Sequence, residues 1–361
     1  MNPNKRLYSL DILRGLTVTL MIFVNNGAGN DIFPLLTHSK WNGITLADFV
    51  FPTFLFIVGV TTWLSLRKFE FKWSGVVSRK LLNRTWKLFL IGLLLNYLDM
   101  ALQGNPLDFG HLRIMGVMQR IALCYFFTSL IVLSCPHKWL PALVLLLLVG
   151  YTLVIYPTGW YYDAQTNILS ISDRAVLGYS HMYHKSPVDP EGLLSTVSAI
   201  AQTLMGFCVA KALSKFKAIK SKMWLLLSTG VFLLVTGLLL TTLLPLNKRI
   251  WSPSFVLVTT AAACLLWTLL VLLLDHKEGL IAHKWMVPFD AMGLNPLVLY
   301  VVSEVVNILF GAFDINEAVF GVCNMLIPLA SWASVAYAAL FTLMHVALAL
   351  VLKARNIIIK L

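Results

Sequence analysis

Residues 9–60 read SLDILRGLTVTLMIFVNNGAGNDIFPLLTHSKWNGITLADFVFPTFLFIVGV and contain two apolar segments joined by a short polar loop. An α-helix of about 20 apolar residues is long enough to cross a hydrocarbon core of about 30 Å. Ionisable groups inside a membrane are costly and usually mark a functional site. The stretch therefore predicts two membrane helices that build a site around their loop. The polar residues in or beside these helices are Asp11, Arg14, Asn25, Asn26 and Asp48.

The composition extends this prediction to the whole chain. Its 361 residues are 58% hydrophobic and 12% charged, whereas a soluble protein carries about 25% charged residues. We expect an all-α, polytopic membrane bundle, because isolated strands cannot satisfy their backbone in lipid. We see no linker or repeat, so residues 1–361 should form a single transmembrane domain. The ten predicted spans are 10–29, 46–66, 80–98, 112–134, 139–156, 192–213, 223–244, 254–274, 287–310 and 328–352.

The net charge of +12 comes from basic residues grouped in alternate connections. Cytoplasmic loops are enriched in Lys and Arg, so both termini should lie inside. Residues 1–6 lack the compact leader and the small-residue cleavage site of a signal peptide, so the first span should be retained. The lack of interleaved aromatic residues argues against a nucleic-acid partner. The basic groups lie at the N-terminus and within 67–87, 211–222 and 353–360. The loop with His38 and residues 157–191, 247–253 and 311–327 should then face outward.

The cysteines favour packing over chemistry. All five lie in or beside apolar segments, and none forms a C-x-x-C pair. We therefore expect no disulfide framework and no metal site. The five are Cys124, Cys135, Cys208, Cys264 and Cys323.

His38 is the histidine that stands beside the intramembrane polar residues. A neutral imidazole can take a proton from an attacking amine or hydroxyl near pH 7, and it can also be acylated itself. A nearby asparagine amide can orient the ring or donate a hydrogen bond to a developing oxyanion. His181 and His184, in a predicted external loop, are candidates for a substrate mouth.

Other polar residues leave alternatives open. Asp11 and Arg14 share a helix face, and they form either a local ion pair or a ligand contact at the cytoplasmic end. Arg120 lies well inside the fourth span, so we expect it to face the bundle interior with an acidic or carbonyl partner. Asp48 and Glu304 are the acidic candidates for that partner.

Two further segments carry predictions about local structure. Asp189 and Glu191 precede the sixth span, where acidic residues favour a helix N-terminus, so they either begin that helix or contribute to a site. Pro296 should kink the ninth span, because proline removes a backbone hydrogen bond and its ring clashes with the preceding turn.

Several motifs together resemble one known family. They are RLYSLDILRG, VNNG, H-x-x-W-N-G-x-x-x-A-D-x-V-F-P-x-F-L-F, RIMGVMQRIALCYF, DPEGLLSTVSAI, NKRIWSPSFVL and GLNPLVLYVVSEV. In this order they resemble the heparan-α-glucosaminide N-acetyltransferase family, part of a wider superfamily of transmembrane acyltransferases. The resemblance covers nearly the whole chain and implies a bacterial transmembrane core in the cytoplasmic (inner) membrane. The lysosomal members carry an additional N-terminal luminal region, which we do not find here.

The resemblance implies transfer of an acetyl group from cytosolic acetyl-CoA to the amine of a terminal glucosamine across the membrane. The family's active-site histidine matches His38, and its supporting asparagine matches Asn25. The loop between them is two residues longer than we expect in the animal enzymes, which bears on sugar specificity. We expect substrate contacts from Trp41, Asp48, Gln119, Arg120, Trp251, Asn295 and Glu304.

Acetyl-CoA is thus the expected co-substrate, without a metal. Arg14 and the basic cluster 67–87, including Arg79 and Arg84, are candidates for its phosphates, with Asn25 at the thioester. Positive-inside bias alone is the other explanation of that cluster. His38 acts either as a general base or through an acetyl-histidine intermediate. The expected partners are acetyl-CoA, an amino sugar and membrane lipid, and family members often pair as homodimers.

The alternative function is an N-acetylglucosamine-related sugar permease, because some bacterial relatives have been labelled as transporters. Transporters often contain internal repeats around a site near the membrane midplane. We find no such repeat in the sequence, which favours the enzyme.

Overall fold

Helices make up nearly all regular structure in the computed structural model, which describes residues 7–156, 164–183, 188–276 and 283–359. Within these ranges no strand occurs, which confirms the all-α prediction. The helices are α1 (Tyr8–Asn25), α2 (Val50–Leu66), α3 (Gly75–Leu102), α4 (Val117–Ser134), α5 (Leu140–Ile155), α6 (Ile168–Leu177), α7 (Leu193–Ser214), α8 (Ile219–Leu240), α9 (Pro253–Leu270), α10 (Val287–Leu294), α11 (Pro296–Ala312), α12 (Ile315–Leu326) and α13 (Ala330–Ala354).

The apolar windows correspond to helices, although fewer than ten are long enough to be counted as spans. In the described ranges eight helices are long and apolar enough to cross a membrane, or nine if α10 and α11 form one bent span. The window 139–156 is α5, which has 16 residues. The window 112–134 begins too early, because the helix starts only at Val117. Two helices were missed, α6 and α12, since both are short and amphipathic rather than uniformly apolar.

The predicted kink at Pro296 is confirmed. Helices α10 and α11 meet at Asn295 with an angle of 77° between them. The Asn295 amide is occupied there by the C-terminal tail: its Nδ2 donates to the carbonyl of Ile357 at 2.9 Å, and its Oδ1 accepts from the backbone N–H of Ile359 at 2.8 Å. Asn295 therefore binds the C-terminal tail at the break between the two helices.

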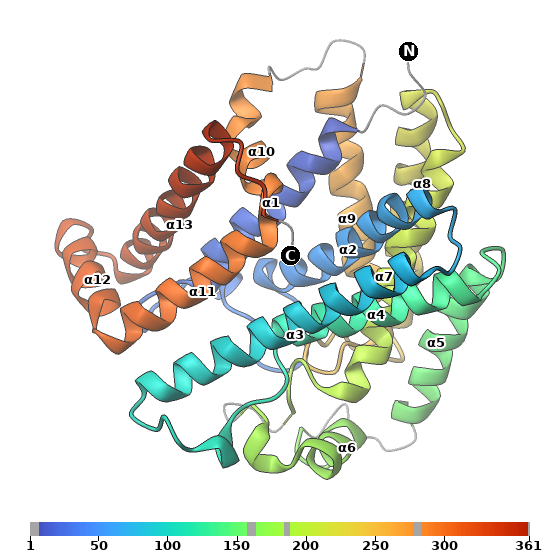
Figure 1. Cartoon of the computed structure of the whole chain (residues 1–361). Helices are drawn as coiled ribbons and strands as arrows, with labels where there is room; N and C mark the ends of the chain where they lie inside the picture. Colours follow the sequence, from blue (N-terminus) through green and yellow to red (C-terminus); the bar gives the residue numbers. More distant parts are fainter. Residues whose placement is uncertain (1–6, 157–163, 184–187, 277–282, 360–361) are drawn as a thin grey trace.

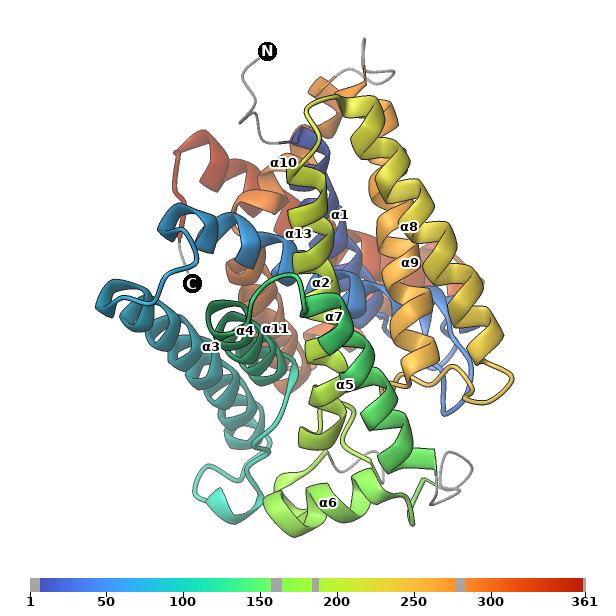
Figure 2. The same cartoon turned by 90° about the vertical axis from the view of Figure 1, so that its right-hand side faces the viewer.

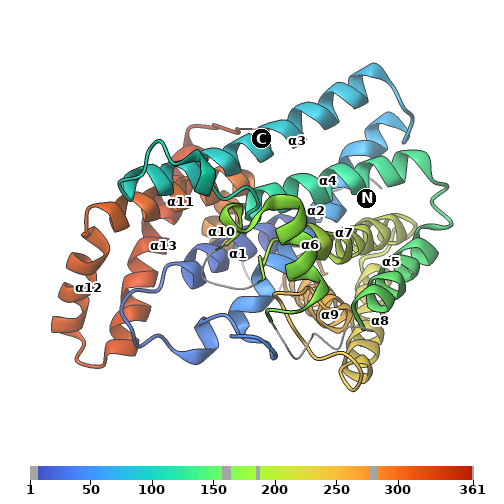
Figure 3. The same cartoon turned by 90° about the horizontal axis from the view of Figure 1, so that it is seen from below.

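The helices are arranged around α1, α2 and α7. Helices α8 and α9 run side by side along one flank, and α6 lies across one end of the bundle (Figure 2). Seen from below, α12 and α13 form one edge and α5 and α8 the opposite edge (Figure 3). Helix α1 packs on α10 from the far end of the sequence (Figure 1). The core between them contains Leu13, Leu55, Phe56 and Phe207, all fully buried.

Glycines allow α2 and α7 to pack with their backbones in contact. A Cβ atom on Gly59 would lie 1.8 Å from the carbonyl oxygen of Thr203, and one on Gly206 would lie 2.0 Å from the carbonyl oxygen of Phe56. Small residues at such crossings are typical of membrane helices, where van der Waals packing drives association. The reciprocal contact fixes the position of α2, which carries part of the site described below.

The substitution Gly206→Ala should destabilise the fold by more than about 2 kcal/mol, because a methyl group against a backbone carbonyl forces α2 and α7 apart. Thermal unfolding in detergent measures this effect. Gly150→Ala in α5 is the matched control, since a Cβ there meets nothing within 4 Å. A Gly206→Ala protein with the unfolding temperature of the wild type would show that the two helices do not pack this closely.

Candidate active site

A histidine–carboxylate pair lies immediately before α2. Asp48 is fully buried at the short turn Leu46–Phe49, where its Oδ2 accepts hydrogen bonds from the backbone of Ser39 at 3.2 Å and of Thr45 at 3.0 Å. Its Oδ1 lies 2.9 Å from Nδ1 of His38. A buried carboxylate needs such partners to offset the loss of water. With Nδ1–H donated to Asp48, Nε2 of His38 remains as the basic nitrogen.

Lys248 lies against this pair from a loop distant in the sequence. Its Nζ atom is 3.0 Å from Nδ1 and 3.1 Å from Nε2 of His38, and 3.5 Å from Oδ1 of Asp48. The Lys248 side chain is 11% exposed. Burial lowers the pKa of Lys248 below its ordinary value, against the opposing effect of Asp48 and Glu191. His38, Asp48 and Lys248 thus form one coupled group of ionisable side chains.

Backbone and amide contacts hold the Lys248 loop over His38. The backbone N–H of Gly43 donates to the carbonyl of Leu246 at 2.8 Å, and Nδ2 of Asn247 donates to Oδ1 of Asn42 at 3.0 Å. These contacts join the loop that follows His38 to the loop that precedes α9. The position of Lys248 therefore depends on the pairing of two loops that the sequence keeps far apart.

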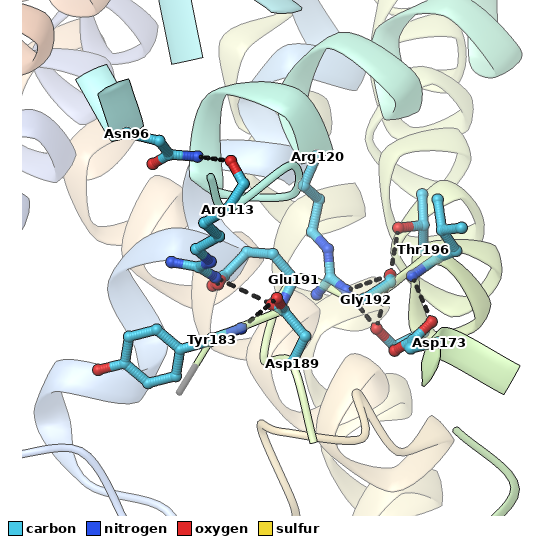
Figure 4. A network of polar contacts seen from close by, with 11 residues as sticks. Asn96, Arg113, Arg120, Asp173, Tyr183, Asp189, Glu191, Gly192 and Thr196 are labelled. Carbon is cyan, nitrogen blue, oxygen red and sulfur yellow. Dashed lines mark hydrogen bonds and ion pairs between the residues drawn. The ribbon is translucent and has the colours of Figure 1, made fainter. Parts of the chain in front are cut away.

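A second group of charges, here called the Arg113 wall, consists of Arg113, Asp189 and Glu191 (Figure 4). The Nη2 atom of Arg113 lies 2.9 Å from Asp189 and 2.7 Å from Glu191, and its guanidinium lies 4.6 Å from the ring centroid of Tyr183. Burial would raise the pKa of Glu191, but Arg113 lowers it overall. Burial would likewise lower the pKa of Arg113, but the two carboxylates raise it overall. Asp189 and Glu191 thus do not begin α7, whose first turn contains no acidic residue; they bind Arg113.

The start of α7 is held by a third carboxylate in the same view (Figure 4). Asp173 in α6 accepts a hydrogen bond from the backbone N–H of Leu193 at 2.9 Å. Burial raises the pKa of Asp173 to about 6. Because Glu191 lies just before this helix, α6 and α7 together set the position of the Arg113 wall.

These two groups enclose a pocket of about 220 Å³, here called the His38 pocket. A cavity of about 150 Å³ can hold benzene, so the volume suits one sugar-sized ring. The predicted residues Asn25 and His38 both line the pocket. Asp48 pairs with His38 but is not itself a lining residue. The lining residues are Met21, Val24, Asn25, His38, Ser39, Ala47, Val50, Phe51, Arg113, Val117, Tyr183, Pro190, Glu191, Lys248 and Arg249.

A larger cavity of about 660 Å³, here called the basic pocket, lies at the other ends of α1 and α2. Arg14 lines it and also forms the predicted ion pair with Asp11, at 2.5 Å. The connection after α2 and the connection between α7 and α8 meet there, so two of the basic groups in the sequence are brought together. The basic lining residues are Arg14, Arg67, Lys68, Lys80, Lys215, Lys217 and Lys222.

Two residues predicted from the same cluster lie outside the basic pocket. Arg79 is exposed on α3, and the guanidinium of Arg84 lies over the ring of Tyr125, 4.4 Å from its centroid. Neither residue is among those that line the cavity. From the predicted cluster, the structure therefore brings Arg67, Lys68 and Lys80 to this cavity, but not Arg79 or Arg84.

The partner of Arg120 is a backbone carbonyl and a serine, not one of the expected acidic residues. Arg120 is fully buried, and its Nη2 donates to the carbonyl of Gly192 at 3.0 Å and to Oγ of Ser195. The carbonyl alternative is thus confirmed, and the acidic candidates are wrong. Asp48 is bound to His38, and Glu304 hydrogen-bonds with Tyr300 on its own helix.

The structure places the remaining predicted substrate contacts away from the lining of the His38 pocket. Trp251 is buried under the Arg120 guanidinium and donates to Gln202 at 3.0 Å. Gln119 is buried against Gly92, and Trp41 packs in a satellite cluster with Tyr151, Ile155, Leu169, Val188 and Ile250. Asn295 and Glu304 lie in the broken span already described.

His181, one of the two histidines predicted for a substrate mouth, does not line the His38 pocket. Nδ1 of His181 hydrogen-bonds with the carbonyl of Leu112 at 2.7 Å, and His181 is not among the lining residues of the His38 pocket. His184 lies outside the described residues.

Sequence reasoning assigned no role in the site to several lining residues, chiefly Arg113, Tyr183, Lys248 and Arg249, and it left Glu191 open between a helix start and a site. A signal for two of them was present. Lys248 and Arg249 lie in a loop predicted to face outward, where basic residues are otherwise scarce. The positive-inside bias does not explain a lysine in a loop that faces outward. The contact of Lys248 with His38 does explain it.

The fold and the site together define a polytopic helical membrane protein with a polar acid–base pocket at one end of its bundle. Residues 6–175 match the family described as heparan-alpha-glucosaminide N-acetyltransferase, catalytic. The chain is 31% identical over 364 residues to heparan-alpha-glucosaminide N-acetyltransferase of Homo sapiens, and 29% identical over 365 residues to that of Mus musculus.

The chain belongs to the heparan-α-glucosaminide N-acetyltransferase family, as the motifs predicted. The alignments cover 83% and 84% of this chain but 53% and 54% of the human and mouse proteins. The chain therefore spans about half the length of the curated relatives that it matches.

Proposed function

We propose that the chain is a transmembrane N-acetyltransferase that moves the acetyl group of acetyl-CoA to the amine of an amino sugar. One observation carries the proposal: α1 and α2 each line both pockets, the basic pocket at one end and the His38 pocket at the other. A basic cavity suits the phosphates of coenzyme A. A pocket with a histidine–carboxylate pair suits the amine that must lose a proton.

The proposed reaction uses His38 as the general base. The amine of the sugar attacks the thioester carbon, Nε2 of His38 takes its proton, and the C–S bond breaks as the C–N bond forms. Coenzyme A leaves as the thiol after receiving a proton. Asp48 stabilises the imidazolium through Nδ1, as carboxylates do in other histidine-dependent transfers. The Asn25 amide, at the end of α1, is placed to donate a hydrogen bond to the developing oxyanion.

The proposed sidedness follows from the charges. The basic pocket is lined by residues from connections that the positive-inside rule assigns to the cytoplasm. Acetyl-CoA therefore enters from the cytosol. The amino sugar then binds on the outer face of a bacterial cytoplasmic membrane. The volume of the His38 pocket favours a single sugar residue, either free or at the end of a chain.

An assay in liposomes tests this function against the permease alternative. Acetyl-CoA is added on one side and glucosamine on the other, and we expect coenzyme A and N-acetylglucosamine to form together. A permease would instead take up labelled N-acetylglucosamine without consuming acetyl-CoA. That second result, with every amino sugar tried, would reject the enzyme.

Charge reversal at the basic pocket should weaken donor binding. The double variant Lys68→Glu with Lys217→Glu changes two lining residues from different connections, and we expect KM for acetyl-CoA to rise about tenfold or more at low salt, a cost of about 1.4 kcal/mol. The effect should shrink as salt screens the phosphates. Arg355→Glu is the control: it also replaces a positive charge by a negative one, but Arg355 is exposed and does not line the pocket. An unchanged KM in the double variant would place the donor elsewhere.

A further inference from the structure

Lys248 places a primary amine beside the proposed catalytic base. Its Nζ atom lies 3.1 Å from Nε2 of His38, and a general base must lie within about 2.6–3.2 Å of the group that it deprotonates. Nζ lies 3.0 Å from Nδ1 as well, and it is thus within the distance over which His38 can take a proton from it. This reasoning rests on the proposed function, because it requires an acetyl thioester to reach His38.

The surroundings of Lys248 favour its reactive form. Only the neutral amine is a nucleophile, and a lysine is activated when its ammonium is desolvated. Burial lowers the pKa of Lys248, and its side chain is 11% exposed. Lys215 and Lys217, at the mouth of the basic pocket, are exposed to solvent by contrast. Lys248 thus differs from these lysines in both position and solvation.

The other cations of the His38 pocket cannot replace Lys248 as acceptors. Arg113 and Arg249 line the pocket, but a guanidinium stays protonated in proteins. Among the lining residues in the described ranges, Lys248 is the one lysine. In the part of the chain that the structure describes, the pocket therefore holds one built-in amine, and this amine contacts the base.

We propose that Lys248 is a self-acetylation site, whose amine takes the acetyl group when acetyl-CoA is supplied without an acceptor sugar. Nζ attacks the thioester carbon, a C–N bond forms, the C–S bond breaks, and the amine proton passes to His38. Coenzyme A leaves as the thiol. The product is a neutral amide that fills the place of the acceptor amine and removes a cation from beside Asp48. An acceptor sugar protects the site by displacing the Lys248 side chain.

The test uses the full chain in liposomes with radiolabelled acetyl-CoA and no sugar, followed by peptide mass spectrometry. We expect acetyl-Lys248 to approach one group per chain. Lys40, exposed and two residues from His38, reports non-enzymatic acetylation and should stay unlabelled. Saturating glucosamine should lower the labelling of Lys248 at least tenfold.

Two variants separate enzymatic from chemical labelling. Lys248→Arg should lose the label, and His38→Ala should lose it as well although Lys248 is still present. No acetyl-Lys248 in a preparation that acetylates glucosamine would overturn this inference and leave the proposed function intact, and label confined to His38 would do the same. If neither glucosamine nor Lys248 is acetylated, the proposed function itself is wrong.

Discussion

His38→Ala should abolish acetyl transfer to an amino sugar while the protein remains folded. The variant removes the basic nitrogen but leaves Asp48 with its backbone partners Ser39 and Thr45. Loss of a general base typically lowers kcat by about 10²–10⁴-fold. The measurement is coenzyme A release with glucosamine as acceptor. Binding of acetyl-CoA, which we assign to the basic pocket, should stay close to that of the wild type.

His111→Ala is the matched control for this experiment. His111 also pairs with an aspartate, Asp108 at 2.8 Å, but it does not line the His38 pocket. It should keep wild-type turnover. If His38→Ala also turned over normally, His38 would lose its role. If both variants failed equally, the defect would lie in folding rather than in chemistry.

Asp48→Asn separates the role of the carboxylate from that of the ring. Asparagine has the same shape but cannot stabilise an imidazolium, and its amide can face Nδ1 of His38 with a donor. We expect kcat to fall while KM for acetyl-CoA stays unchanged. A fall in acetyl-CoA affinity instead would mean that Asp48 acts on the donor side.

The fold was largely predictable, because membrane helices can be recognised in a sequence by their length and their apolar composition. Even the break in the α10–α11 span followed from one residue, Pro296. Helices α6 and α12 were not predicted, because only one face of each is apolar. Such a pattern within a polar loop resembles neither a membrane span nor a linker. Their positions depend on the bundle surface that they cover, which no local window contains.

The site was predictable only in part, and the reason is distance along the chain. His38 and Asp48 lie ten residues apart, so one loop brings them together. Lys248 is 210 residues from His38, and Glu191 is 78 residues from Arg113. A single sequence contains no spacing rule for such contacts. Trp251 and Gln119 show the converse: a motif position can serve the core that supports a pocket rather than its lining.

The second large effect is expected at the wall that faces His38. Arg113→Ala leaves Asp189 and Glu191 without their guanidinium partner, and their side chains are 0% and 10% exposed. Breaking a buried ion pair by removing one partner typically costs about 3–5 kcal/mol, because a charge is left buried without compensation. Thermal unfolding in detergent near neutral pH should reveal the loss.

The pH dependence of this loss identifies its cause. Arg113 lowers the pKa of Glu191 in the folded protein, so the stabilisation is present above the ordinary glutamate value of about 4.3 and disappears as the pH falls. The gap in unfolding temperature between wild type and Arg113→Ala should therefore narrow in acid. A gap that stayed constant to pH values well below 4.3 would indicate lost packing on Tyr183 instead.

Neutralising the carboxylates should separate the stability of this wall from its use by the substrate. The triple variant Arg113→Ala, Asp189→Asn and Glu191→Gln contains no unpaired buried charge, so most of the lost stability should return. Its wall is no longer charged, however, and an amino sugar enters this pocket as an ammonium ion. We therefore expect KM for glucosamine to be raised in the triple variant relative to the wild type while KM for acetyl-CoA is normal. Wild-type values of both constants would mean that the Arg113 wall supports the fold without contacting the acceptor.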